Sequence, residues 1–393
     1  MNKLKILFIH IGNTIINKDN DKLVVKNNNL IYKNGRKDGY YFNKEYYEIP
    51  LWIPRVCYFL PDNEFDKSLY IAKDLNRTVT HIINTNPDII LFSCMSANQQ
   101  YVRDLVDFIS SKTNIDVIVG TYIRLDYYRI NNRVRVCNSL EDLAKLLVVD
   151  YKYGLDYSLF KNEWTVPRLT MSYGCEGNCT FCANIEHNNI MQVPTKDIKE
   201  QYLTFKNLKF ELVYIDDKSW GDCNNYSILS SSFFNSKFIV QTNVYNVLNK
   251  IYRLNYRNCK IKYIELGIEC YDNDILRAMN KIQDIISINK AIYTLYIEDV
   301  KIIPNIILGH PLMTIRSYEQ TLNWLHSNKD KFHHININPL ALYEGTKDYN
   351  IYNPKKEDGN QGTFDKSFLT KDQIELSRKY YNEYYKINKE ILK

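Results

Sequence analysis

The second half of the chain alternates short, strongly apolar runs with segments whose apolar residues repeat at helical spacing. Six runs read as strands, and they cover residues 169–172, 211–215, 238–241, 262–268, 301–308 and 334–338. The clearest helical spacing between them spans residues 315–325. Strands that alternate with helices favour a parallel sheet joined by right-handed crossovers. We therefore expect an α/β fold in which these six βα units form a partial (βα)6 barrel of the TIM type.

The first half shows the same alternation over a smaller unit. Strands are predicted at residues 5–9, 88–93 and 116–120, and helices at 101–109 and 139–147. A further helix is predicted from apolar residues at helical spacing, namely Phe65, Leu69, Ala72, Val79 and Ile82. This order predicts a doubly wound, flavodoxin-like parallel sheet.

Residues 17–49 interrupt that pattern. The run is polar and rich in asparagine, and Asn34-Gly35 is typical of a hairpin turn. We expect an irregular insertion there, within a first domain of residues 1–150.

The predicted barrel covers residues 160–350, and a tail follows over residues 351–393. A capping box from Thr370 to Gln373 opens that tail. Its Tyr-rich remainder predicts one long C-terminal helix packed on the barrel.

Three cysteines are crowded into one loop directly after the first barrel strand. Cys175, Cys179 and Cys182 have the spacing C-x3-C-x2-C, with an aromatic residue just before the last thiol. Iron-sulfur clusters normally take four cysteines, so a cluster held by three keeps one iron open for a small molecule. Gly174 and Gly177 allow the backbone to turn tightly around the metal. The loop therefore predicts a cluster with a reactive iron.

Zinc is the competing interpretation of this loop. His187 lies five residues after Cys182 and would complete a Cys3His set of ligands with the three cysteines. On that interpretation the chain is a zinc-stabilised binding module.

Composition excludes some classes of protein. The net charge is only +6, from 51 basic and 45 acidic residues, so charge does not indicate a nucleic-acid or membrane-surface binder. No apolar stretch approaches the length of a membrane span. The nine cysteines are odd in number and three share one loop, which does not indicate a disulfide framework. We therefore expect a reducing compartment, the cytoplasm.

The cysteine loop and three later segments resemble the radical S-adenosylmethionine (SAM) superfamily. The loop has the spacing of that family's cluster motif, and Glu265-Leu-Gly-Ile-Glu269 with the following residues 272–281 is similar to its strand ending in Gly-Ile-Glu and the helix behind it. Residues 303–311, which end in Leu-Gly-His-Pro, resemble a later strand, and residues 343–346 resemble the loop after the sixth strand. The four landmarks occur in the family's order.

The resemblance implies which residues bind cofactors. Cys175, Cys179 and Cys182 would hold a 4Fe-4S cluster whose open iron binds SAM, and reductive cleavage of SAM would yield a 5′-deoxyadenosyl radical. Strand ends suggest the SAM contacts, which are Gln241, Glu269, Asp216, Asp217 and Gly309. For each of these a surface, capping or packing role is the alternative. No residue is assigned to acid-base or hydrogen-donor chemistry.

The first domain resembles the cobalamin-binding domain that precedes the barrel in one subgroup of the family. The resemblance rests on the strand order, on Asp88-Ile-Ile-Leu-Phe-Ser93 and on Val117-Ile-Val-Gly120. It implies bound cobalamin, with Ser93 and Ser96 facing the corrin. The motif Asp-x-His-x-x-Gly is absent, because the chain reads His10-Ile-Gly-Asn13 after the first strand. The alternative is a domain that only covers the barrel or recruits substrate.

Together the resemblances imply a cobalamin-dependent methyltransferase that acts on an unactivated carbon of a small-molecule or peptide substrate. A cobalamin-independent epimerase, crosslinking enzyme or rearrangement enzyme is the alternative reaction. Either enzyme would need a one-electron donor of the flavodoxin or ferredoxin type.

Overall fold

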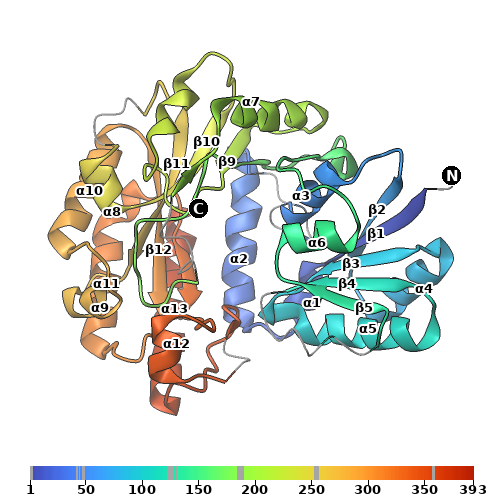
Figure 1. The fold of residues 1–393 in the computed structure, drawn as a ribbon. Coiled ribbons are helices and arrows are strands. Elements are labelled where there is room, and N and C mark those ends of the chain that lie inside the picture. Colours follow the sequence, from blue (N-terminus) through green and yellow to red (C-terminus); the bar gives the residue numbers. More distant parts are fainter. Residues whose placement is uncertain are drawn as a thin grey trace. The chain divides into compact units, whose positions relative to one another are not determined.

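The computed structural model describes residues 3–40, 43, 45–46, 49–121, 128, 131–183, 190–251, 256–355 and 359–393. The chain forms two compact units (Figure 1). Unit 1 comprises Met1–Asp19, Phe42–Thr165 and Glu200–Lys209, and unit 2 comprises Asn20–Tyr41, Val166–Lys199 and Phe210–Lys393.

Unit 1 is built on a five-stranded sheet in the order β2-β1-β3-β4-β5, and every pair of neighbours is parallel. Its strands are β1 (Leu4–Ile11), β2 (Phe65–Ala72), β3 (Ile89–Ser93), β4 (Asp116–Gly120) and β5 (Val134–Cys137). Its helices include α1 (Asn13–Ile16), α3 (Trp52–Phe59), α4 (Leu75–Thr85), α5 (Gln99–Lys112) and α6 (Leu140–Leu146). This is the doubly wound strand order of flavodoxin-like folds, and it confirms the predicted fold.

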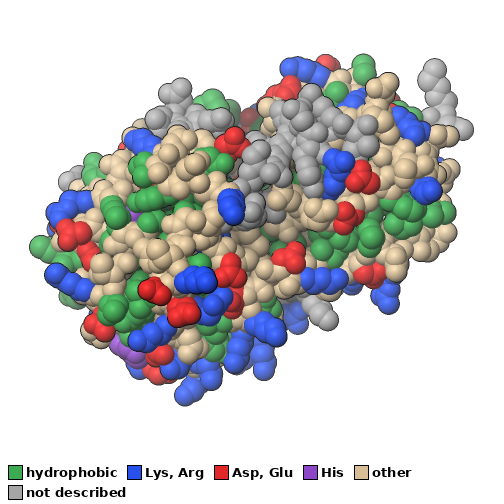
Figure 2. All heavy atoms as spheres, turned by 90° about the horizontal axis from the view of Figure 1, so that it is seen from below, with side chains coloured by type: hydrophobic (Ala, Val, Ile, Leu, Met, Phe, Trp, Pro, Cys, Tyr) green, Lys and Arg blue, Asp and Glu red, His purple; other side chains and the backbone are tan. Residues whose placement is uncertain are grey.

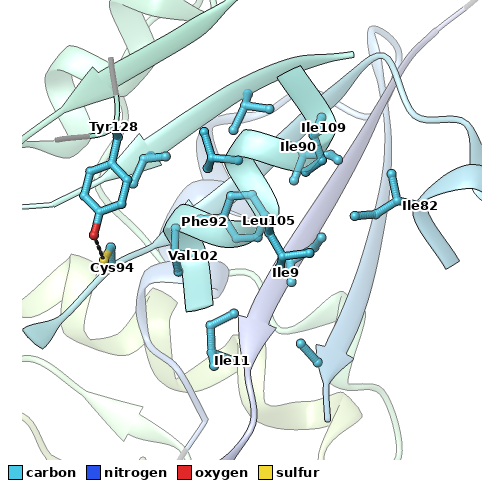
Figure 3. Packing of buried hydrophobic residues seen from close by; sticks show 14 of the residues in the cluster. Ile9, Ile11, Ile82, Ile90, Phe92, Cys94, Val102, Leu105, Ile109 and Tyr128 are labelled. Atoms are coloured by element: carbon cyan, nitrogen blue, oxygen red, sulfur yellow. Dashed lines mark hydrogen bonds between the residues drawn. The ribbon is translucent and has the colours of Figure 1, made fainter. Parts of the chain in front are cut away.

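One core of unit 1 lies between one face of the sheet and the helices α4 and α5. Ile9 and Phe92 of the sheet pack against Val102 and Leu105 of α5 in one buried apolar cluster (Figure 3). At its edge the Sγ atom of Cys94 lies 2.8 Å from the hydroxyl of Tyr128. The central strands are apolar on both faces, which is why they were predicted from continuous apolar runs in the sequence.

One predicted helix of unit 1 is partly wrong. Residues 65–72 form the edge strand β2, and α4 begins only at Leu75. Strand β2 pairs with β1 over eight residues, from Leu4 opposite Phe65 to Ile11 opposite Ala72. This pairing satisfies the backbone hydrogen-bonding groups along that edge of β1. Only three apolar residues of this range, Phe65, Leu69 and Ala72, had the helical spacing, so the signal for a helix was weak. Strand β5 and helix α3 were not predicted.

Unit 2 is built on a six-stranded parallel sheet in the order β13-β12-β11-β10-β9-β6. The strands are β6 (Arg168–Leu169), β9 (Leu212–Ile215), β10 (Lys237–Asn243), β11 (Ile261–Glu269), β12 (Lys301–Leu308) and β13 (Asn336–Pro339). A two-stranded antiparallel pair, β7 (Ser172–Tyr173) and β8 (Met191–Gln192), flanks the cysteine loop. The six strands agree with the six predicted barrel strands.

The helices of unit 2 follow its strands. They include α8 (Val244–Asn249), α9 (Asn273–Ala278), α10 (Ile285–Ile297), α11 (Ile315–Asn328), α12 (Lys347–Tyr352) and α13 (Lys371–Ile391), whereas α7 (Thr195–Leu203) crosses the boundary between the units. Helix α13 begins at the predicted capping box, where Thr370 accepts a hydrogen bond from the Gln373 backbone, and it packs on α11 and β13.

The prediction of an irregular insertion at residues 17–49 is wrong for the part that the structure shows as helix. Residues Lys22–Gly35 form the helix α2, and η1 (Arg36–Asp38) extends it, so Asn34-Gly35 is not a hairpin turn. Asp21 caps the helix by accepting from the backbone N–H of Leu23. Val24, Asn27 and Ile31 are buried at helical spacing. The helical spacing is not apparent in the sequence because a polar residue, Asn27, occupies one of the buried positions.

Helix α2 and the residues after it belong to unit 2, where α2 packs on α13 (Figure 1). The Asn388 amide donates to Asn27 Oδ1 at 3.0 Å. Beyond the helix, Asp38 accepts from Lys262 through its backbone carbonyl and lies 2.8 Å from His333 Nε2 through its carboxylate. Because Lys262 is the second residue of β11 and His333 precedes β13, this segment lies at the amino ends of these barrel strands.

Charges of both signs are interspersed over the surface that Figure 2 shows. This agrees with the near balance of 51 basic and 45 acidic residues. Among the helices in the described ranges, none is long and apolar enough to cross a membrane.

Asn388 offers a test of how much the α2–α13 contact contributes to stability. Its side chain is fully buried and hydrogen-bonds to both backbone groups of Ile335 as well as to Asn27. We expect Asn388→Ala to lower the free energy of unfolding by about 3 kcal/mol, because it leaves several buried polar groups unpaired. Urea denaturation measures this, with the exposed helical asparagine variant Asn323→Ala as control. Equal stability of the two variants would contradict the expectation.

Candidate active site

The cysteine loop lies at the carboxyl edge of the unit 2 sheet, the edge that carries the site in full barrels. It begins with Gly174, whose φ of +84° strongly favours glycine. A Cβ on Gly177 would lie 3.3 Å from the Sγ atom of Cys175 and 3.8 Å from that of Cys179. The Gly177 N–H donates to Cys175 Sγ at 3.2 Å. The loop thus keeps the space between two thiols free of side chains and directs a donor at sulfur.

Burial makes two thiols of this loop, Cys175 and Cys179, harder to deprotonate. Burial raises the pKa of Cys175 to about 11 and also raises the pKa of Cys179. A metal centre must therefore displace protons to bind here, as is usual for thiolate ligands.

The three cysteines supply the donor set of an iron-sulfur cluster, and the space beside Gly177 is free of side chains. Within the described ranges, no group of three or more His, Cys, Asp or Glu side chains is arranged to hold a metal ion. His187, the predicted fourth zinc ligand, lies outside the described residues.

Two other segments hold the cysteine loop in place. The Thr180 N–H donates to the Met279 carbonyl at 3.1 Å, and the Asn280 amide donates to the Asn178 carbonyl at 2.6 Å. From the other side, Asp348 binds Thr180 twice, through its N–H to the Thr180 carbonyl and through its carboxylate to the Thr180 hydroxyl. These bonds fix the loop between α9 and α12.

Asp217 braces the strands that lead into the loop. Its buried carboxylate accepts from the backbone N–H groups of Met171 and Ser172 at 2.8 and 2.9 Å and from the Ser172 hydroxyl at 2.7 Å. Burial raises the pKa of Asp217 to about 6, although these bonds oppose the shift. The contacts support a structural role, and the predicted SAM contact of Asp217 stays a prediction.

Glu269 ends β11 beside the cysteine loop. Its φ is +68°, unusual for a residue with a side chain, and the β11–β12 register shifts between Gly267 and Glu269. Its carboxylate lies 2.8 Å from the ammonium of Lys281, and both side chains are at least nine-tenths buried. Although burial alone lowers the pKa of Lys281, Glu269 and the nearby Cys179 raise it above its ordinary value. A buried ion pair thus lies close to the thiols.

Sequence reasoning did not assign Lys281. A single lysine after a helix is normally a surface residue, and only its burial beside the thiols marks it as part of the site. No signal in the sequence alone would have found it.

Gln241 lies on the polar, accessible face of the sheet. Towards the carboxyl ends of β10 to β13, partly exposed side chains alternate with buried ones. The partly exposed polar positions in these parts of the strands are Gln241, Asn243, Glu265, Asn305, Asn336 and Asn338. Because alternate residues of a strand point to opposite faces, these side chains share the inner face, and the helices cover the apolar one. The sheet therefore presents a wall of amides and one carboxylate, and Asn305 is a site residue that sequence reasoning missed.

Asp216 and Gly309 make contacts within unit 2 that account for their positions. The Asp216 carboxylate lies 2.6 Å from the Arg168 guanidinium. Gly309 has φ +82°, donates its N–H to the Tyr318 hydroxyl, and faces Leu369 and Ser377. These contacts support pairing and packing roles, and the predicted cofactor roles of both residues stay predictions.

In unit 1 the crevice for a ligand is expected where the strand order reverses, between β1 and β3. Gly12 and Asn13 follow β1, and Ser93 ends β3. Asn13 is 9% exposed, and its Nδ2 has no hydrogen-bond partner among the described residues. An unpaired buried donor at this place fits a bound polar ligand. Ser96 begins the short helix η2 (Ser96–Asn98), but its side chain lies outside what the structure describes.

No protein-family model matches the chain, and no curated protein matches it by sequence. Solved structures do match by fold. The cobalamin-dependent S-adenosylmethionine radical enzyme OxsB, with aqua-cobalamin and S-adenosylmethionine bound, is 14% identical with a TM-score of 0.59, over 94% of this chain and 57% of OxsB. The chain thus spans little more than half the length of that enzyme.

A second match is the radical S-adenosylmethionine methyltransferase TsrM from Kitasatospora setae with cobalamin and a 4Fe-4S cluster bound. It is 8% identical with a TM-score of 0.55, over 88% of this chain and 74% of TsrM. The same enzyme with tryptophan substrate and a SAM analogue bound is 9% identical with a TM-score of 0.54, over 87% of this chain and 74% of TsrM. At such identities the likeness shows the fold, so this chain shares the two-unit α/β fold of cobalamin-dependent radical SAM enzymes.

Proposed function

We propose that the chain is a radical SAM enzyme. The observation that carries the proposal is the cysteine loop itself, which presents three thiols, two of them beside Gly177, at the carboxyl edge of a six-stranded parallel sheet. Cys175, Cys179 and Cys182 would hold a 4Fe-4S cluster, leaving one iron for SAM. The shared fold supports this assignment.

Such a cluster, once bound and reduced, supplies the electron that cleaves SAM and releases a radical able to take hydrogen from an unactivated C–H bond. The chain's own residues bind and orient. Lys281 offers a cation for the SAM carboxylate, and Glu269 offers a carboxylate for its ammonium or ribose hydroxyls. Since Lys281 and Glu269 pair with each other in the absence of ligand, SAM would exchange one buried ion pair for two.

Unit 1 is proposed to bind cobalamin. Three observations support this: the doubly wound sheet, the Asn13 Nδ2 atom that has no partner among the described residues at the switch point, where the strand order reverses between β1 and β3, and the cobalamin bound in OxsB and TsrM. Asn13 and Ser93 would contact the cofactor there. Bound cobalamin supplies a transferable methyl group, so methylation of an unactivated carbon is the proposed reaction.

Substrate, partner and compartment are proposed on the same basis. TsrM was solved with tryptophan, which supports a small molecule as substrate. Cleavage of SAM requires an electron, so a donor of the flavodoxin or ferredoxin type is the proposed partner. A reducing compartment such as the cytoplasm suits the nine cysteines, which are all free.

Cys179→Ala tests the cluster. We expect the variant, reconstituted anaerobically with iron and sulfide, to lose most of its bound iron and at least about a hundredfold of the 5′-deoxyadenosine formed from SAM, because a cluster held by two thiolates is not retained. Iron analysis and chromatography of the products measure this. Cys259→Ala is the control, since that buried thiol lies outside the loop. Unchanged cleavage by Cys179→Ala, or stoichiometric zinc in the parent protein, would refute the assignment.

Corrinoid binding tests unit 1. We expect the protein to retain about one equivalent of hydroxocobalamin through gel filtration, detected by its visible absorbance. Asn13→Leu should weaken the affinity about tenfold, because it removes a buried donor from the switch point. The matched control is Asn76→Leu, at an exposed position of α4. A protein that cleaves SAM but retains no corrinoid would favour the epimerase, crosslinking or rearrangement alternative.

A further inference from the structure

We infer that Glu265 and Tyr214 orient the amide of Gln241 so that its carbonyl oxygen faces the open inner side of the barrel. These residues lie on neighbouring strands, Tyr214 on β9, Gln241 on β10 and Glu265 on β11, and Gln241 is directly opposite Glu265 in the register. The inference rests on the proposed function, because it concerns how the barrel presents Gln241 to SAM.

The Tyr214 hydroxyl has two neighbours but only one proton. It lies 2.7 Å from Glu265 Oε2 and 3.3 Å from Oε1 of Gln241. A carboxylate is the stronger acceptor, and 2.7 Å is the length of a charge-assisted O–H···O bond. The proton therefore belongs to Glu265. The longer contact is a hydrogen bond only if Gln241 donates to the phenol oxygen.

A donating Gln241 means that its nitrogen, and not its oxygen, points at Tyr214. Amide oxygen and nitrogen are told apart by their hydrogen-bond partners rather than by shape. With the oxygen toward Tyr214, the nitrogen of Gln241 has no partner among the described residues, whereas the turned amide satisfies the phenol oxygen. The carbonyl oxygen then faces the inner side of the sheet, where Gln241 is partly exposed.

Arg168 lies against the hydrogen-bonded set of Glu265, Tyr214 and Gln241, which we call the relay. Its guanidinium lies over the Tyr214 ring, 4.9 Å from the ring centre, and is itself bound by Asp216 at 2.6 Å. A cation over an aromatic face is favourable, and it clamps the ring from the side of β6. Burial raises the pKa of Glu265, and the hydrogen bond from Tyr214 and the charge of Arg168 reduce that rise.

The consequence is a specific role for two residues that need not touch SAM. An outward carbonyl oxygen accepts hydrogen bonds and so suits the methionyl ammonium, whereas an outward amide nitrogen would repel it. Glu265 and Tyr214 are thus positioning residues for Gln241. This arrangement also explains why a carboxylate lies within the barrel although Arg168 is already paired with Asp216.

Single substitutions in the relay, and an exchange of the side chains at positions 241 and 265, test the inference. The dissociation constant of SAM is measured by equilibrium dialysis on the reconstituted, unreduced protein, in which no turnover occurs. We expect Tyr214→Phe and Glu265→Gln each to weaken binding about tenfold, because each frees the Gln241 amide to turn. The single variant Gln241→Glu should bind SAM at least as weakly. It places two carboxylates beside one phenol, whose single proton can bond to only one of them, so the two charges repel each other.

The double variant Gln241→Glu/Glu265→Gln should recover most of the lost affinity. Tyr214 then donates to the carboxylate introduced at position 241, whose second oxygen faces the ammonium, while the new amide at position 265 donates to the phenol oxygen. Purely structural roles predict no such recovery. Tyr263→Phe, a buried barrel tyrosine outside the relay, is the matched control, and iron content and melting temperature verify that each variant is folded.

The outcomes separate two failures. A parent protein that binds no SAM refutes the proposed function and the relay with it. A parent that binds SAM, with unchanged affinity in Tyr214→Phe and Glu265→Gln or with no recovery in the double variant, refutes the relay alone.

Discussion

The buried ion pair of Glu269 and Lys281 is the interaction on which the candidate site depends. Taking two charges out of water costs several kcal/mol per ion, and their mutual attraction often does no more than offset that cost. Here the carboxylate also requires an unusual backbone at Glu269, with φ +68° and a register shift beside it. Strain and burial at one point rarely serve stability. Both features lie beside Cys179, where the charged ligand SAM is proposed to bind.

The same segment couples that pair to the thiols. Lys281 follows Met279 and Asn280, which hydrogen-bond to the cysteine loop. A displacement of the loop would therefore move the cation as well. The short connection after α9 thus fixes the position of the proposed SAM contact Lys281 relative to the cysteine loop.

Sequence reasoning found the parts of the fold that repeat and missed the parts that depend on distant contacts. The barrel strands and the helix after Thr370 were predicted because a continuous apolar run or a capping box is a local signal. Helix α2 was missed because its burial depends on α13, more than 300 residues away, through the Asn27–Asn388 bond. Strand β2 was mistaken for a helix because an edge strand needs few apolar residues. The site followed the same rule, since the cysteines are a local motif, whereas Lys281 is recognised only by what surrounds it.

The inner face of the barrel departs from the apolar filling of full barrels. Amides and the carboxylate of Glu265 occupy positions where branched aliphatic side chains would pack better, so the sheet gives up stability along this face. Such a loss is expected where a polar ligand takes the place of packing. Towards the carboxyl ends of β11 and β12 the departure is confined to the inner face, because the alternate residues there remain apolar. Selection for solubility would not produce that one-sided pattern, whereas the ligand proposed to bind against the inner wall accounts for it.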